Sequence, residues 1–192
     1  METLQAIRTR RSIRRFKNEP LDQNTIEKIL EAAILAPSAK NSQPWRFTVV
    51  RGAQRDEMLH RVQRAIEQRV ADGEDVGSSR STLRVMQQAP VTILIHNTQG
   101  IHPWKARKEH ESWWDVATVQ SIGAAIENML LAATQMGIGS LWIADIWEAY
   151  VELNEWLQTD DQLVAAVSLG LPDQEPRDPT RKPMDKVVRW ME

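Results

Sequence analysis

A short basic segment near the N-terminus carries the side chains best suited to chemistry. It follows a predicted helix and reads Arg10-Arg11-Ser12-Ile13-Arg14-Arg15-Phe16. A guanidinium group can donate two parallel hydrogen bonds to a phosphate, and a serine hydroxyl adds a short donor. The segment therefore suits a phosphate or another anion, and a solvated basic stretch without a ligand would have the same composition.

A second polar segment lies between the end of a predicted helix and the start of a predicted strand. It carries uncharged donors and acceptors bracketed by prolines, namely Pro37, Ser38, Asn41, Ser42, Gln43 and Pro44. Such side chains suit the polar edge of a flat heterocycle. An Asx or serine turn would use the same residue types, so the pattern leaves both interpretations open.

Other kinds of chemistry are missing from the sequence. It contains no cysteine, which excludes disulfides, zinc–thiolate sites, iron–sulfur ligation and thiol nucleophiles. The four histidines occur in separate predicted elements without ligand spacing, so we predict no metal site. There is no dinucleotide-binding glycine fingerprint, no Walker-type phosphate loop and no nucleophile elbow. The sequence is instead rich in tryptophan, with eight residues.

Length and charge narrow the class of protein. A chain of 192 residues with 42% apolar and 26% charged residues is ordinary for one globular domain, 1–192. The net charge of −2 gives no global field for nucleic acid or an anionic membrane. No apolar run approaches the ~18 residues of a membrane span, and the N-terminal residues lack the apolar region of a signal peptide. We expect a cytoplasmic protein that binds neither nucleic acid nor membrane.

The apolar periodicity predicts a mixture of helices and strands. Helices are predicted at 2–9, 24–36, 53–70, just before Pro90, at 116–136 and at 147–158. Strands are predicted at 47–50, 91–95, 140–144 and 163–169. Asn24 and Glu27 have the spacing of a capping box at the start of the second helix. Because the elements do not alternate strictly, the pattern favours an α+β fold.

Two segments fit no regular element. Residues 171–192 contain four prolines and predict an extended arm, with a possible last strand at 187–190. An arm without a core of its own is expected to pack on something, and in a small protein this can be another subunit. Residues 97–114 hold Trp104, Trp113 and Trp114 among many charges. They form either a lid over a substrate or a surface loop whose tryptophans reach the core.

Taken together, these segments resemble the FMN-dependent nitroreductase family. The resemblance rests on residues 10–16 followed by residues 37–45, which read Pro37-Ser38-Ala39-Lys40-Asn41-Ser42-Gln43-Pro44-Trp45. It continues through the helix of small residues that leads into 137–143, and through Arg181-Lys182-Pro183. It covers essentially the whole chain and implies a mostly antiparallel sheet flanked by helices. It also implies an intertwined homodimer with FMN at the interface and the arm reaching the partner.

The resemblance also implies the residues of the cofactor site. FMN phosphate, the ribityl chain and the N1/O2 edge of the ring would be held by Arg10, Arg11, Ser12 and Arg14, with Arg181 added to the phosphate site. The other subunit would contribute Pro37, Ser38, Asn41 and Gln43, and the ring would be lined by Trp142, Ile143 and Ala144. Family members often have a glycine just after the strand beside flavin N5, where this chain has Ala144-Asp145. The motif therefore leaves open which N–H meets N5.

The activity implied is an oxidoreductase with a ping-pong mechanism. NADH or NADPH reduces the flavin, and a nitroaromatic, quinone or similar small acceptor then takes two electrons. Because the flavin carries the redox chemistry itself, no catalytic side chain is expected. Other readings are a flavin-fragmenting or reductively dehalogenating enzyme of the same fold, a flavin-binding protein without turnover, and a nucleic-acid-binding protein that uses the basic head.

Overall fold

The computed structural model describes residues 2–192. The helices are α1 (Thr3–Thr9), α2 (Gln23–Ile34), α3 (Ala53–Ala71), α4 (Ser79–Met86), α5 (Glu109–Gln135) and α6 (Tyr150–Leu157). The strands are β1 (Trp45–Arg51), β2 (Val91–Asn97), β3 (Gly139–Ile143) and β4 (Gln162–Gly170). Three short 3-10 helices complete the fold: η1 (Ala39–Asn41), η2 (Asp145–Ala149) and η3 (Met184–Lys186). The predicted α+β class is confirmed.

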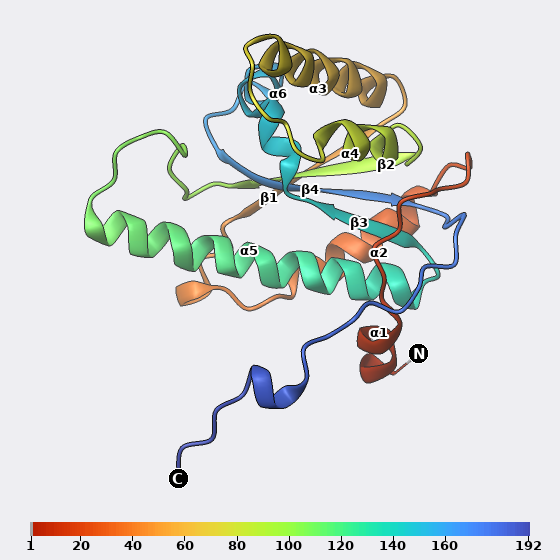
Figure 1. Ribbon diagram of the computed structural model, residues 1–192, viewed down its shortest axis with the longest axis vertical. Coiled ribbons are helices and arrows are strands. Elements are labelled where there is room, and N and C mark those ends of the chain that lie inside the picture. The colour runs from red at the N-terminus through yellow and green to blue at the C-terminus, as the bar shows by residue number, and fades with distance from the viewer. Residues whose placement is uncertain (1) are drawn as a thin grey trace.

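The four strands form one antiparallel sheet in the order β1-β2-β4-β3. Every residue of β2 and β4 is buried, because both strands lie in the middle of the sheet and helices cover both faces. Helices α2 and α5 lie on one face, and α3, α4 and α6 lie on the other (Figure 1). Side chains alternate between the faces, so Ile93 and Ile95 pack in the α2/α5 cluster while Leu94 packs in the α3/α6 cluster.

Helix α5 forms the centre of one layer. Its length and apolar composition alone would allow it to cross a membrane. In this fold, Ile122, Ile126 and Met129 are fully buried in the cluster that α5 shares with α2 and the sheet. The Asn128 side chain donates to the Ala32 carbonyl over 3.1 Å and fastens the helix to the end of α2. Helix α5 is therefore a core helix that serves as a platform for the segments around it.

The predicted starts of two helices are wrong. Helix α2 is capped by Asp22 and not by Asn24: Asp22 accepts from the Thr25 N–H at 2.9 Å and from the Thr25 hydroxyl at 2.6 Å. The Thr25 hydroxyl also lowers the pKa of Asp22 below its usual 3.8. Helix α5 begins at Glu109 and not at 116, because the Glu111 carboxylate accepts from the Lys108 N–H at 2.6 Å in a capping box. The extra turns are mostly exposed and lack an apolar stripe.

The predicted last strand at 187–190 is also wrong. These residues are exposed, and no strand within residues 2–192 pairs with them. In Figure 1 the arm leaves the body of the molecule and ends far from the sheet. A strand needs a hydrogen-bonding partner, so the sequence pattern of residues 187–190 is not sufficient to form one within a single chain.

Candidate functional site

The basic segment is fixed along the outer edge of the sheet. The Ile13 N–H donates to the Ser140 carbonyl at 2.9 Å, beside β3. The same segment pairs with the first residues of the arm: the Lys17 N–H donates to Leu171 and the Asp173 N–H to Arg15, each at 2.9 Å. Gly139 permits this approach, because a Cβ there would lie 3.0 Å from the Ile13 side chain. The N-terminal arginines and the arm are therefore brought together at the edge of β3.

Between them lies a hollow of about 420 Å³, which we call the arginine hollow. It is lined by Arg10, Arg11, Ser12, Arg14, Gln174, Pro176, Arg177, Pro179 and Arg181. The structure thus brings together five residues that the sequence singles out, four from the N-terminus and one from the arm. It adds Arg177 and Gln174, and the Gln174 side chain accepts from the Arg14 N–H at 3.1 Å. No sequence motif marks these two residues, because only the course of the arm places them there.

The arginine hollow carries an excess of positive charge. Arg11 pairs with Asp178, and Arg10 Nε lies 3.7 Å from a carboxylate oxygen of Glu127. Arg14, Arg177 and Arg181 form no ion pair with any residue from 2 to 192. Three uncompensated guanidinium groups and a serine hydroxyl match the charge and geometry of a phosphate group.

A second hollow of about 380 Å³, the β3 hollow, shares Arg14 with the first. Its other lining residues are Ser78, Ser81, Thr82, Val85, Leu141, Trp142, Ile143, Ala144 and Asp145. Trp142, Ile143 and Ala144 are thus placed together, as the sequence predicts. The Trp142 side chain remains 42% exposed and lies over Gly123 of α5. Apolar and hydroxyl side chains beside a cationic hollow suit a ligand with a flat ring and a phosphate.

Helix α4 and the start of η2 contribute residues that sequence reasoning missed. Asp145 Oδ2 accepts hydrogen bonds from the Ser78 and Thr82 hydroxyls, both at 2.8 Å. These two hydroxyls come from the first turn of α4 and the residue before it, far from β3 in the sequence. Serine and threonine in a polar helix are common on protein surfaces and do not by themselves indicate a binding site. Only the packing of α4 against η2 identifies Ser78 and Thr82 as part of the hollow.

The loop that contains Pro37, Ser38, Asn41 and Gln43 lies apart from both hollows, and none of these four residues lines either one. Ser38 Oγ accepts from the Gln43 N–H at 3.0 Å and so closes the turn within its own chain. The loop is fastened to α5 by the Ala39 N–H, which donates to Ser121 Oγ at 3.0 Å. Lys40, Asn41 and Gln43 have φ values of 52°, 53° and 46°, so backbone strain is stored in this turn.

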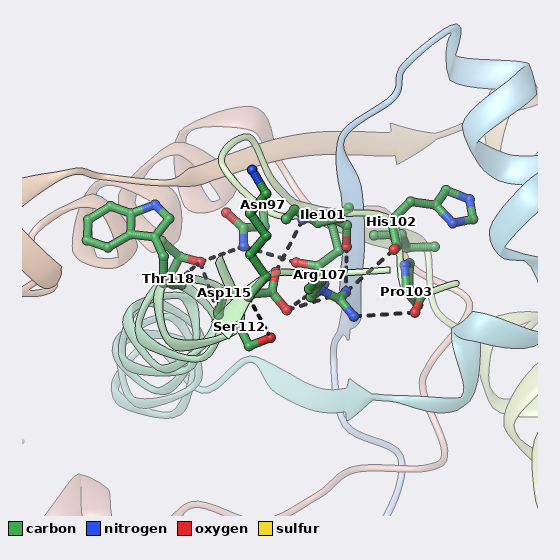
Figure 2. Close-up of polar contacts among 12 residues, drawn as sticks. Asn97, Ile101, His102, Pro103, Arg107, Ser112, Asp115 and Thr118 are labelled. Carbon is green, nitrogen blue, oxygen red and sulfur yellow. Dashed lines mark hydrogen bonds and ion pairs between the residues drawn. The ribbon is translucent and has the colours of Figure 1, made fainter. Parts of the chain in front are cut away.

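The segment before α5 is held by a polar network shown in Figure 2. Asp115 Oδ1 accepts from the Ile101 N–H at 3.2 Å, and Arg107 Nη2 lies 3.6 Å from Asp115 Oδ2. Arg107 also donates to the Ile101 carbonyl at 2.8 Å, which closes the loop on itself. The buried Asn97 amide donates to Thr118 and Gln162 at 2.8 and 3.0 Å. The loop is therefore anchored to α5 and the sheet.

Of the three tryptophans in this region, Trp114 is half-buried and the other two are exposed. Trp104 and Trp113 are 61% and 69% exposed, and Trp113 and Trp114 belong to α5. Trp104 instead packs edge-on against Tyr150, with ring centroids 5.1 Å apart. The capping box extends α5 over Trp113 and Trp114, so these two tryptophans belong to a helix and not to the predicted irregular segment. A role as a substrate lid stays a prediction.

His96 is the buried titratable group nearest this network along the chain. It is almost fully buried, and its Nε2 lies 3.3 Å from Asn154 Oδ1. Burial lowers the pKa of His96 below its ordinary value of 6.5. Among residues 2–192, no three His, Asp or Glu side chains gather as metal ligands would. His96 is therefore a structural residue and lies outside both hollows.

Comparisons with known proteins give this geometry a context. Residues 7–171 match the family model described as Nitroreductase family. A protein of Archaeoglobus fulgidus, provisionally named NADH dehydrogenase/NAD(P)H nitroreductase, is 35% identical over 178 residues, 91% of this chain and 87% of that protein. The 5,6-dimethylbenzimidazole synthase of Rhodospirillum rubrum is 26% identical over 170 residues, 86% of this chain and 80% of that protein. A crystal structure of a nitroreductase with bound FMN from Bacteroides fragilis superposes over the whole of both chains, with a TM-score of 0.77 and 25% identity.

Proposed function

The chain belongs to the nitroreductase family, and from this premise we propose that it is an FMN-dependent oxidoreductase. NADH or NADPH would supply the electrons, and a nitroaromatic, quinone or similar small molecule would accept them. The observation that carries the proposal is the pair of adjoining hollows that share Arg14, one cationic and the other walled by the end of β3. We place the reaction in the cytoplasm, where both nicotinamide donors are available.

The residues of the two hollows fit FMN in charge and shape. Arg10, Arg177 and Arg181 would hold the phosphate, with Ser12 as a further donor. The ring would be lined by Trp142, Ile143 and Ala144. The Ser81 hydroxyl lies beside them. Among residues 2–192 it donates only to the Ser78 carbonyl, and its oxygen could accept a hydrogen bond from the pyrimidine edge. The hollows thus supply cations where the cofactor is anionic and a largely apolar wall where it is flat.

Bound FMN would supply a two-electron carrier whose reactive atom belongs to the cofactor and not to the protein. The chain's own residues would bind it, orient it and tune it. Arg14 would stabilise the negative charge that gathers on the ring during reduction, because among the described residues, 2–192, it is the one cation that lines the β3 hollow. No Cys, His or Ser nucleophile is needed, and the hollows contain neither cysteine nor histidine.

The complete site would need a second copy of the chain. Pro37, Ser38, Asn41 and Gln43 lie apart from the hollows of their own chain, so in the proposed homodimer they would meet the flavin held by the partner. The arm supports this arrangement, since Met184, Val187 and Trp190 are exposed and have no core of their own. Strand β1 is an outer strand of the sheet and offers unpaired backbone groups to an added strand.

The proposal is tested on the purified protein. We expect yellow protein with FMN released on denaturation, and anaerobic NADH or NADPH should bleach it. Arg14→Ala should weaken FMN binding by about tenfold to a hundredfold, because a charge-assisted hydrogen bond is lost. Arg64→Ala is the matched control, since Arg64 is exposed on α3 and lines neither hollow. Colourless protein that FMN cannot reconstitute would contradict the proposal.

A second candidate function rests on the similarity to 5,6-dimethylbenzimidazole synthase. The dimethylated benzene ring in that enzyme's named product also occurs in flavins, so a flavin-fragmenting reaction is the alternative. We would expose the reduced, FMN-loaded protein to oxygen without an added acceptor. Full recovery of oxidised FMN favours the acceptor reductase, whereas stoichiometric loss of FMN with appearance of dimethylbenzimidazole favours the alternative.

A further inference from the structure

We propose that Asp145 lowers the reduction potential of the flavin by holding a fixed negative charge at the wall of the β3 hollow. The inference rests on the FMN site proposed above. Asp145 stands directly after Ala144, at the start of η2, and its side chain is half-buried. It is one of the residues that line the β3 hollow.

The carboxylate is held firmly without being neutralised. Its Oδ2 accepts from the Ser78 and Thr82 hydroxyls at 2.8 Å each. Both donors are uncharged, so they fix the position of the negative charge and leave it in place. Among residues 2–192 no cation forms an ion pair with Asp145, and no donor reaches its Oδ1. A charged oxygen thus remains available toward the hollow.

The charges around the hollow are few and opposed. Among residues 2–192, Arg14 and Asp145 are the only ionised side chains that line it. Glu148, on the same 3-10 helix, forms an ion pair with Arg69, and the Arg69 Nε lies 3.0 Å from the Glu148 carboxylate. A cation favours electrons on the ring and an anion disfavours them, since Coulomb interactions act strongly where water is partly excluded. Asp145 therefore offsets part of the effect of Arg14.

A lower reduction potential of the flavin would change which acceptors the enzyme can reduce. A flavin of lower potential is a stronger reductant once NADH or NADPH has reduced it. Two electrons can then pass to acceptors that are themselves hard to reduce. Asp145 would thus widen the range of usable acceptors toward low-potential nitroaromatics, at the cost of a smaller driving force for the reduction of the flavin by the nicotinamide.

Asp145→Asn tests the charge separately from the hydrogen bonds. The amide oxygen can still accept from Ser78 and Thr82, whereas the negative charge is gone. We expect the ratio of reduced to oxidised flavin at a fixed applied potential to rise about tenfold, a shift of ~30 mV for a two-electron couple. The potential is measured anaerobically against a reference dye. Asp145→Glu should restore a potential close to that of the natural chain.

Two controls isolate the effect. Glu31→Gln removes the same charge from an exposed position on α2 that forms no ion pair within residues 2–192, and it should leave the potential unchanged. Thr82→Val removes one hydrogen bond but keeps the Asp145 charge, and it should change the potential much less than Asp145→Asn. If Asp145→Asn folds poorly, Asp145→Ser serves as the second neutral variant.

The outcomes separate this inference from the proposed function. A natural chain that binds no FMN overturns the proposed function. An FMN-loaded Asp145→Asn protein with an unchanged or lower potential overturns only the role of Asp145. A shift in Thr82→Val as large as that in Asp145→Asn would also overturn it, because the hydrogen bond and not the charge would then control the potential.

Discussion

Arg14 is the residue on which the two halves of the proposed site depend. Its neighbours in the sequence suggest anion binding, and the resemblance to the family assigns it to the flavin. Arg177 has the same side chain but no motif around it, so the sequence gives no reason to choose it over any other arginine. Its place in the arginine hollow follows from the hydrogen bonds that tie residues 171–174 to the N-terminal segment.

His96 gives a prediction about pH at the scale of a single residue. Burial lowers its pKa in the folded protein, whereas in the unfolded chain the ring titrates near 6.5. As the pH falls below that value, the unfolded state therefore takes up the proton first. We expect this group to leave the free energy of unfolding unchanged above pH 6.5 and to decrease it as the pH falls toward the lower, folded pKa.

Urea denaturation at about pH 7.5 and about pH 5.5 measures this loss of stability. His96→Gln should reduce the difference in unfolding free energy between the two pH values, whatever it does to the absolute stability. His60→Gln is the matched control, because His60 is exposed on α3. An undiminished pH dependence in His96→Gln would show that other groups cause it.

At the scale of an element, the loop before α5 depends on one carboxylate. Asp115 accepts from the Ile101 N–H and lies near Arg107 and Gln162 (Figure 2). Asp115→Ala should lower the free energy of unfolding by about 2 kcal/mol, because it leaves partly buried donors without an acceptor. The same variant should expose the loop to trypsin at Lys105, since the loop loses its anchor.

Asp115→Asn provides the comparison, because its amide oxygen can still accept from the Ile101 N–H. It should lose less stability than Asp115→Ala and resist trypsin for longer. Equal trypsin sensitivity of the natural chain and Asp115→Ala would show that the remaining hydrogen bonds hold the loop. Anchoring by Asp115 also bears on the lid prediction, since a loop with this many contacts to α5 can open only by breaking them.

At the scale of the whole molecule, the exposed apolar side chains of the arm have no packing partner within a single copy of the described residues, 2–192. Its last residues include exposed apolar side chains, with Trp190 80% exposed. They follow a tract whose residues 171–178 form hydrogen bonds and an ion pair with the N-terminal segment. A hollow of about 310 Å³ lies beside β1, lined by the apolar Ile26, Leu30 and Val49 together with Gln23, Glu27 and Arg51. Both features agree with the proposed homodimer.

Deletion of residues 184–192 should therefore convert a dimer into a monomer, while Arg177 and Arg181 of the arginine hollow are retained. Light scattering at several protein concentrations measures the mass, and circular dichroism checks that the sheet and helices persist. As a control, Trp104→Ala removes an exposed tryptophan outside the arm and should leave the dimer intact. A natural chain that is monomeric with FMN bound would contradict the shared site.

The sequence by itself determined the class of fold, most element positions and the basic segment that enters the proposed site, because apolar periodicity and local motifs are properties of neighbouring residues. It did not determine the caps of α2 and α5, which depend on Asp22 and Glu111 rather than on the apolar pattern. Only the tertiary structure decided that Arg177, Ser78, Thr82 and Asp145 meet the predicted residues, and that Pro37–Gln43 do not. The physical reason is that these contacts join segments far apart in the chain, and their positions are set by how α4, η2 and the arm pack against the edge of the sheet.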